Sequence, residues 1–294
     1  MKKDACAYGG YVYQDISMPL VRCPVCGLKY IDYELSDELR ELLYNEHAYF
    51  ESAYAGGGGQ GNYVENRERQ EEKARHALDT IARFKKDGSL FEVGCAGGYL
   101  LHLAQERGYR VSGVEMSQEM AAHARAQGLE VVTGELHDVP KGKIFDVVYL
   151  GGVLEHVNNP LQFVREIAER VVKGGIIAIE VPLTYNLTLP GLVIGCMQAL
   201  RGHFGYQYFL PAQHRGRLTR ENPYHLSFFN HSSLLAVMRR ADLTVRYLSI
   251  YEGAPKQKFS GSGYSFLKGV INFLPRWIGL NCLGDRAFVV ARKD

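Results

Sequence analysis

Between residues 90 and 182 the hydrophobic positions follow two alternating spacings. Short apolar runs that end in Gly, Glu or Pro predict buried strands, and apolar residues three and four positions apart predict helices between them. We expect strands at 90–93, 110–115, 130–133, 145–150 and 176–181, and helices at 98–107, 117–127 and 160–172. This alternation is typical of a parallel sheet with crossover helices.

The flanking segments extend this pattern. An amphipathic helix should precede residue 90, because Ala74, Ala77, Leu78, Ile81 and Phe84 share one face. After residue 182, a helix at 232–241 and strands at 243–251 and 287–291 would complete the sheet, with the last strand antiparallel. We divide the chain into 1–35, a small Cys-containing module; 36–89, a helical connector with a Gly-rich loop; 90–182, the ligand-binding core; and 183–294, which carries the acceptor pocket.

Composition narrows the class of ligand. The chain has 294 residues, with 34 Lys and Arg against 32 Asp and Glu, so its bulk charge gives no reason to expect a nucleic-acid partner. Small-molecule binding is the better expectation. No apolar stretch follows Met1-Lys2-Lys3, and the apolar runs at 187–200 and 264–283 are interrupted by Pro, Gly or charged residues. We therefore expect a cytoplasmic protein.

A glycine-rich turn follows the first strand, in the segment Glu92-Val93-Gly94-Cys95-Ala96-Gly97-Gly98. Glycines let backbone N–H groups approach a ligand, and the N-terminus of the next helix favours negative charge. A dinucleotide fingerprint would place Gly or Ala where Tyr99 stands, which counts against NAD. The turn therefore predicts a nucleotide-like ligand other than NAD.

The second strand ends at Glu115, followed by Met116. A carboxylate at this edge of a parallel sheet can accept hydrogen bonds from both hydroxyls of a ribose. The alternative is that Glu115 only helps to cap the next helix.

Further segments follow in a recognisable order: Gly134-Glu135-Leu136, Leu150-Gly151 and Leu154-Glu155-His156-Val157. Together with the turn they resemble the class I S-adenosylmethionine (SAM) dependent methyltransferases, in the branch with Leu-Glu-His-Val after the fourth strand. Ala96 replaces the middle glycine of that family's turn, and we expect a negative φ there, which Ala tolerates. The resemblance implies a Rossmann-like, seven-stranded α/β sheet that is mostly parallel.

The resemblance also implies which residues bind SAM. Glu92, Gly94, Ala96 and Gly98 would hold the methionine portion, Glu115 and the adjacent Met116 the ribose, Glu135 and Leu136 the adenine, and Leu150 and Gly151 the neighbourhood of the sulfonium.

Two histidines are candidate bases for deprotonating an acceptor hydroxyl. His156 follows the fourth strand, and the resemblance places the segment around His225 at the active site. Glu155 and His156 would alternatively serve only to orient their loop.

The N-terminal segment suggests a metal. Cys23-Pro24-Val25-Cys26-Gly27 has the spacing of a turn that directs two thiolates at one zinc ion, and Cys6 offers a third ligand. His47 or a water would complete the site. The alternative is a set of buried thiols without metal.

The acceptor is the least determined part. The basic residues His214, Arg215, Arg217 and Arg220 suit a phosphate or form a solvated loop. Resemblance to bacterial sugar and cell-envelope glycan methyltransferases implies a nucleotide- or lipid-linked sugar, methylated at oxygen. Residues 264–283 would pack on the core or contact a membrane surface. The rival functions are an NAD(P)-dependent Rossmann oxidoreductase and a non-catalytic SAM-fold protein that binds a partner.

Overall fold

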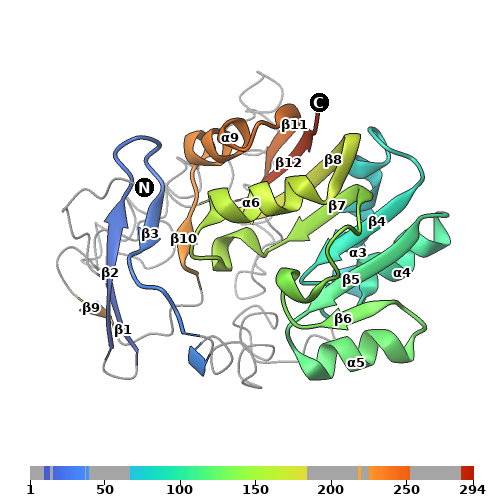
Figure 1. The fold of residues 1–294 in the computed structure, drawn as a ribbon, viewed down its shortest axis with the longest axis horizontal. Coiled ribbons are helices and arrows are strands. Elements are labelled where there is room, and N and C mark those ends of the chain that lie inside the picture. The colour runs from blue at the N-terminus through green and yellow to red at the C-terminus, as the bar shows by residue number, and fades with distance from the viewer. Residues whose placement is uncertain are drawn as a thin grey trace, which may run out of the picture.

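The computed structural model describes residues 10–13, 16–36, 38–39, 67–183, 218–219, 225–251 and 286–294. Its centre is a seven-stranded sheet in the order β11-β12-β8-β7-β4-β5-β6 (Figure 1). The strands are β4 (Ser89–Val93), β5 (Arg110–Glu115), β6 (Val131–Thr133), β7 (Phe145–Gly151), β8 (Val171–Pro182), β11 (Thr244–Tyr251) and β12 (Arg286–Arg292). Strands β4 to β8 pair in parallel, and β12 runs antiparallel to both β8 and β11. The predicted α/β fold class is confirmed.

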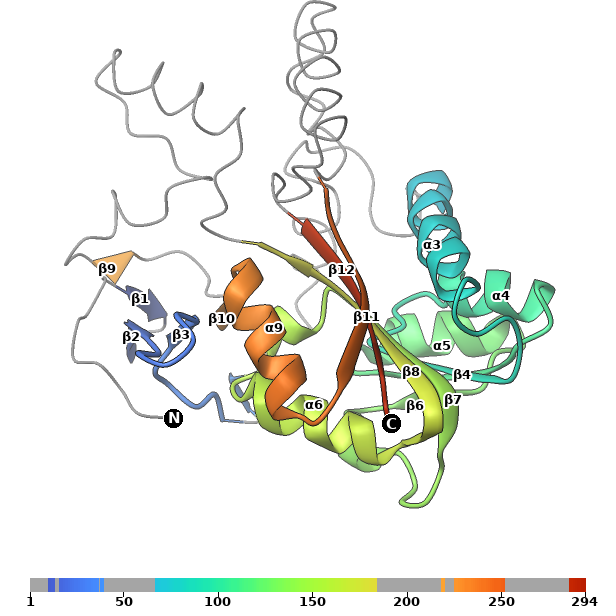
Figure 2. The same cartoon turned by 90° about the horizontal axis from the view of Figure 1, so that it is seen from above.

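Helices cover both faces of this sheet. They are α3 (Arg67–Ile81), α4 (Tyr99–Glu106), α5 (Gln118–Ala126), α6 (Pro160–Glu169) and α9 (His231–Arg240), with the short 3-10 helices η1 (Leu136–Asp138) and η2 (Leu154–His156). Figure 2 shows α6 and α9 on one side and α3, α4 and α5 on the other. Leu90 packs in the core on the α3 side and Phe91 in the core on the α6 side, as the alternation along a strand requires.

The strand order creates a point of divergence at β4. The chain proceeds from β4 to β5 and β6 in one direction, and then returns to β7 and β8 on the other side of β4. Crossover connections leave in opposite directions there, so the carboxyl ends of β4, β5 and β7 border a crevice, which is where open α/β sheets bind ligands.

The predicted boundary between the helix at 160–172 and the strand at 176–181 is wrong. Helix α6 ends at Glu169 instead of residue 172, and β8 begins at Val171 instead of residue 176. The register between β7 and β8 shifts between Phe145 and Val147, so β8 carries an irregularity that contains two glycines. A Cβ on Gly175 would lie 2.8 Å from the backbone oxygen of Asp146, which explains a glycine inside this strand.

A second, five-stranded sheet has the order β10-β3-β2-β1-β9. Its strands are β1 (Gly10–Tyr13), β2 (Ile16–Arg22), β3 (Lys29–Ile31), β9 (Leu218–Thr219) and β10 (Ser227–Phe228). The pairing of β10 with β3 joins the N-terminal hairpin to the segment that carries His225. The sheet therefore combines strands from the predicted 1–35 module with strands from the predicted 183–294 region.

Asp146 fastens the amino end of β7 to that of β4. Its Oδ2 accepts hydrogen bonds from the Ser89 backbone N–H (2.8 Å) and hydroxyl (2.9 Å), and its Oδ1 lies 3.0 Å from Lys85 Nζ. The backbone hydrogen bond from Ser89 is the main reason that the pKa of Asp146 falls to about 2. The carboxylate is therefore more stable in the folded than in the unfolded protein.

We expect Asp146→Asn to lower the free energy of unfolding by about 1–2 kcal/mol at pH 7. Because the folded pKa lies below the unfolded one, this contribution is present above about pH 4 and is lost as the pH falls toward 2. Urea unfolding at several pH values measures it. Asp79→Asn, at an exposed carboxylate 2.7 Å from Arg107, is the control and should change stability by less than about 0.5 kcal/mol. An effect of Asp146→Asn that does not shrink in acid would contradict this account.

Candidate active site

Three residues of the glycine-rich turn between β4 and α4 have left-handed backbone conformations. Gly94, Ala96 and Gly98 have φ values of 68°, 45° and 79°. The expectation of a negative φ at Ala96 is therefore wrong. An L-residue in this region costs about 1–2 kcal/mol relative to its preferred conformations. A Cβ at Gly98 would clash with the Leu129 side chain, which would have to move.

Glu115 holds this turn in place. Its Oε2 accepts a hydrogen bond from the Ala96 N–H (2.8 Å) and its Oε1 accepts one from the Ser117 N–H (2.9 Å). Burial raises the pKa of Glu115, and these backbone hydrogen bonds oppose the rise. The cap of α5 is Ser117, which accepts from Met120 N–H. A carboxylate offers about four acceptor sites and three backbone N–H groups, those of Ala96, Met116 and Ser117, bond to Glu115, so it can still accept from a ribose hydroxyl.

Glu92 is buried beside this turn, with 7% of its surface exposed. Its Oε2 has no hydrogen-bond partner among the described residues. Burial, and then the charge of Glu115, raise the pKa of Glu92 well above its usual value. A buried carboxyl without a donor is costly, so a ligand that brings an ammonium group would compensate it.

Residues that follow β6 and β7 also make hydrogen bonds and core contacts within the protein. Gly134 N–H donates to the Glu115 carbonyl (2.8 Å), and Glu135 N–H donates to Asp138 Oδ2 (2.8 Å) in a capping box that begins η1. Leu136 and Leu150 are buried in the core, so contacts of Leu150 with a ligand would come from its backbone. Met116 is half-buried beside Glu115. Adenine contacts of Glu135 and Leu136, and a sulfonium contact of Gly151, stay predictions.

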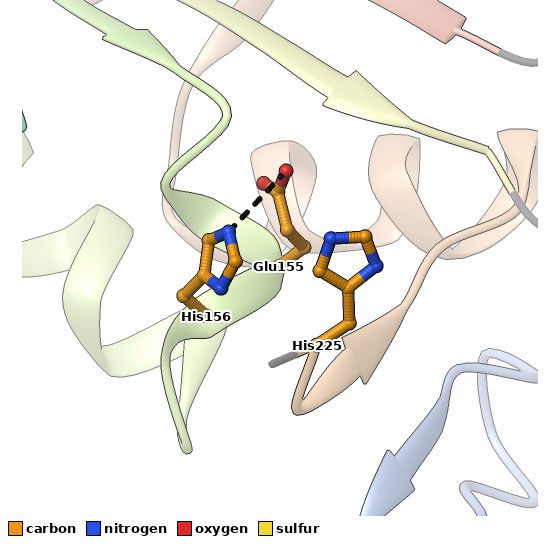
Figure 3. Close-up of side chains that lie close together, drawn as sticks. All are labelled: Glu155, His156 and His225. Carbon is orange, nitrogen blue, oxygen red and sulfur yellow. Dashed lines mark ion pairs between the residues drawn. The ribbon is translucent and has the colours of Figure 1, made fainter. Parts of the chain in front are cut away.

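The structure brings the two predicted histidines together (Figure 3). Their ring centroids lie 5.0 Å apart at an interplanar angle of 73°. Leu226 N–H donates to the Glu155 carbonyl (2.8 Å), and the Ser227 hydroxyl donates to the Val157 carbonyl (3.3 Å). These bonds fix the segment with His225 against η2, although the two segments are far apart in sequence.

Glu155 completes this group. Its Oε1 lies 3.8 Å from His156 Nε2, and its Oε2 is buried without a hydrogen-bond partner among the described residues. Burial raises the pKa of Glu155 to about 7. Glu155, His156 and His225 offer ligand atoms within 4.8 Å of one another, and they are the one set of three in the described part of the chain that could hold a metal ion.

His225 is neutral at pH 7, and the same pKa shift that keeps it neutral also makes it a weaker base. Crowding by protein atoms, followed by the charges of His156 and Arg286, lowers its pKa below the usual value, although part of its surface remains accessible to solvent. The ring is therefore neutral at pH 7 and carries a free nitrogen lone pair.

The N-terminal cysteines form a compact turn between β2 and β3. Cys23 N–H donates to the Leu28 carbonyl (2.8 Å), and Gly27 N–H donates to the Cys23 carbonyl (2.9 Å). Burial would raise the pKa of the Cys23 thiol, but backbone hydrogen bonds from Cys26 and Val25 outweigh it and lower the pKa. Cys6, the basic residues His214, Arg215, Arg217 and Arg220, and the apolar segment at 264–283 lie outside the described residues.

The sequence analysis did not predict a buried charge network near His156 and His225. Glu180 in β8 is 8% exposed, lies 3.1 Å from Arg286 Nη1 and accepts a weak hydrogen bond from the Tyr149 hydroxyl (3.4 Å). The signal was available, because Glu180 interrupts an otherwise apolar strand, and buried Glu is rare without a partner.

Comparison with known families identifies the family of this chain. Residues 63–248, more than half of the chain, match the family model described as a methyltransferase domain. The chain belongs to the class I SAM-dependent methyltransferases. This confirms the family inferred from the turn and the Leu-Glu-His-Val segment, and it disfavours the oxidoreductase alternative.

Several individual proteins resemble this methyltransferase. It is 32% identical over 166 residues to a protein from Caulobacter sp. (strain K31) named ubiquinone biosynthesis O-methyltransferase, a match over 48% of this chain and 65% of the relative. Its fold is similar to that of a magnesium protoporphyrin IX methyltransferase from Synechocystis PCC 6803 with bound SAH (TM-score 0.55, 12% identity, covering 88% of this chain and 100% of that one). A SAM-dependent methyltransferase from Archaeoglobus fulgidus is also similar (TM-score 0.50, 18% identity, 84% and 100% covered).

The residues at the turn fit SAM. The unpartnered Glu92 Oε2 can accept from the ammonium of its methionine portion, and Glu115 can accept from its ribose. The absence of side chains at Gly94 and Gly98 lets this turn pack closely against Val153 and Leu129. None of the helices that the structure describes has the length and hydropathy of a membrane span.

We expect Glu115→Ala to weaken SAM binding by roughly 10- to 100-fold, because it removes charged hydrogen bonds to the ligand and to the turn. Titration calorimetry on the folded variant measures this. Glu130→Ala is a suitable control, since Glu130 is exposed and pairs with Lys143 (2.6 Å); its SAM affinity should equal that of the wild type. Unchanged SAM affinity in Glu115→Ala, or NAD binding without SAM binding, would contradict the assignment.

Proposed function

We propose that this chain transfers the methyl group of SAM to an oxygen atom of a small acceptor. The observation that carries the proposal is the pairing of neutral His225 with His156 and Glu155 at the sheet edge that also bears the SAM-binding turn. The name of the Caulobacter relative, an O-methyltransferase, supports oxygen as the atom methylated. That name points to a quinone precursor as acceptor, whereas the sugar-linked acceptor expected earlier has no support among these relatives.

The chain's own residues supply positioning and a proton acceptor. When bound, SAM provides an electrophilic methyl group on a sulfonium. The turn and Glu115 hold the cofactor, and positioning of the two reactants lowers the barrier of such a displacement. A neutral His225 would take the proton of the acceptor hydroxyl, whose oxygen would receive the methyl group that bound SAM supplies.

We expect His225→Asn to lower kcat by about 10²- to 10⁴-fold, the usual contribution of a general base. SAM affinity should stay within about twofold of the wild type, because SAM binding is assigned to other residues. The measurement uses a panel of phenolic and sugar-linked acceptors with product detection by mass spectrometry. His137→Asn is the control, since His137 is exposed on η1 and should leave the rate unchanged.

Two results would contradict the base assignment. Equal rates for wild type and His225→Asn would exclude His225 from proton transfer. Binding of SAM without product from any acceptor in the panel would favour the non-catalytic alternative.

A zinc ion at the N-terminal turn is a separate proposal. Its support is the turn between β2 and β3, which carries Cys23 and Cys26 at zinc-ligand spacing and in which the pKa of the Cys23 thiol is lowered, although burial raises that of Cys26. Elemental analysis of the purified chain should find about one zinc per chain, and Cys23→Ser should lose it. The control is Cys95→Ser, which changes a buried thiol in the glycine-rich turn and should retain the metal. Metal-free wild-type protein purified under reducing conditions would refute this proposal.

A further inference from the structure

The connection between β6 and β7 differs from the other crossovers between the parallel strands of the central sheet. Helix α4 links β4 to β5, α5 links β5 to β6, and η2 and α6 link β7 to β8, whereas β6 is joined to β7 by η1 and a loop at 139–144. A single 3-10 turn has few hydrogen bonds of its own, and the last carbonyl groups of a helix have no partner inside it. The segment 134–144 therefore needs hydrogen bonds from other elements to keep a fixed conformation.

Arg170 supplies such hydrogen bonds from the end of α6. Its Nη2 donates to the carbonyls of Leu136 (3.0 Å) and Val139 (3.0 Å). Its Nη1 donates to the Pro140 carbonyl (3.2 Å). A charged donor makes stronger hydrogen bonds than a neutral one, and the planar guanidinium can bind several oxygens at once. One side chain therefore fixes the end of η1 and the first residues of the loop that follows it.

The backbone of Arg170 is itself fixed. Its N–H donates to the Ile167 carbonyl in α6 (2.9 Å), and its carbonyl accepts from the Phe145 N–H at the start of β7 (2.8 Å). The residue is half-buried, between the last residue of α6 and the first residue of β8. Its side chain therefore holds η1 at a fixed position relative to α6 and β7.

The residues with predicted adenine contacts, Glu135 and Leu136, stand at the start of η1. This start follows the carboxyl end of β6, and the Gly134 N–H joins it to the end of β5 through the Glu115 carbonyl (2.8 Å). Arg170 binds the opposite end of the same short helix. Because η1 is a single turn, loss of the Arg170 hydrogen bonds would change the position of its start as well.

We propose that Arg170 is a positioning residue that fixes η1 for recognition of the adenine base of SAM. It acts through the backbone of η1 and has no assigned contact with the ligand. This role rests on the prediction that Glu135 and Leu136 contact adenine. Groups held at fixed positions can distinguish the 6-amino group of adenine from the 6-oxo group of hypoxanthine, because an acceptor in the protein that meets a donor in one base meets a second acceptor in the other.

Titration calorimetry with the full chain tests this role without turnover, using S-adenosylhomocysteine and its inosine analogue as ligands. The wild type should bind S-adenosylhomocysteine at least about tenfold more tightly than the inosine analogue. Arg170→Met should weaken binding of S-adenosylhomocysteine by about tenfold and binding of the inosine analogue by less than about twofold. The preference for adenine should therefore shrink in this variant.

Arg165→Met is the matched control. Arg165 is an exposed arginine of the same helix, and it also donates to a backbone carbonyl, that of Arg240 in α9 (2.8 Å). Both affinities of this control should equal those of the wild type. Arg170→Lys is a second test variant, because lysine keeps the charge but lacks the planar fork that reaches several carbonyls. Its preference for adenine should lie between those of the wild type and Arg170→Met.

Three results would overturn the proposal: an unchanged preference for adenine in both Arg170 variants, an equal loss of affinity for both ligands, or a wild type that binds both ligands equally. An equal loss would assign Arg170 to the general stability of the fold. If Arg170→Met does not fold, Arg170→Lys decides by the same comparison. All of these results are independent of proton transfer by His225, since the two ligands carry no transferable methyl group and no acceptor is present.

Discussion

The Glu115 carboxylate is the interaction on which the site depends. It joins the end of β5 to the glycine-rich turn through the Ala96 N–H and to the start of α5 through the Ser117 N–H. These bonds help to hold Ala96 in a left-handed conformation that costs about 1–2 kcal/mol. The same carboxylate is the expected ribose ligand, so the group that shapes the turn also selects the cofactor.

Buried carboxyls recur along this edge of the sheet, at Glu92, Glu115, Glu155 and Glu180. Each has a different balance of partners. Glu115 accepts backbone hydrogen bonds and Glu180 pairs with Arg286, whereas Glu92 and Glu155 each keep an oxygen without a partner among the described residues. Unpartnered buried groups destabilise a fold, and their concentration here is what a binding site for a polar, cationic cofactor requires.

Different groups of residues in the candidate site have different expected roles. The turn and the first two carboxyls fit the cofactor, and the histidine pair offers a proton acceptor. The histidine pair forms because β10 pairs with β3 and Leu226 bonds to η2, so the N-terminal hairpin helps to support the segment that carries His225. Changes in that hairpin would therefore reach the active site through β10.

The amino-acid sequence by itself determined the central sheet, the glycine turn and the family, because strand and helix periodicities and the Gly94 to Gly98 segment are local patterns. It could not reveal the start of β8, since a bulge depends on the partner strand, or the positive φ of Ala96, which a hydrogen bond from a distant carboxylate stabilises. Only the tertiary structure placed His225 against His156 and His76 of α3 against Tyr251 of β11, because long-range pairing of distant segments sets those contacts.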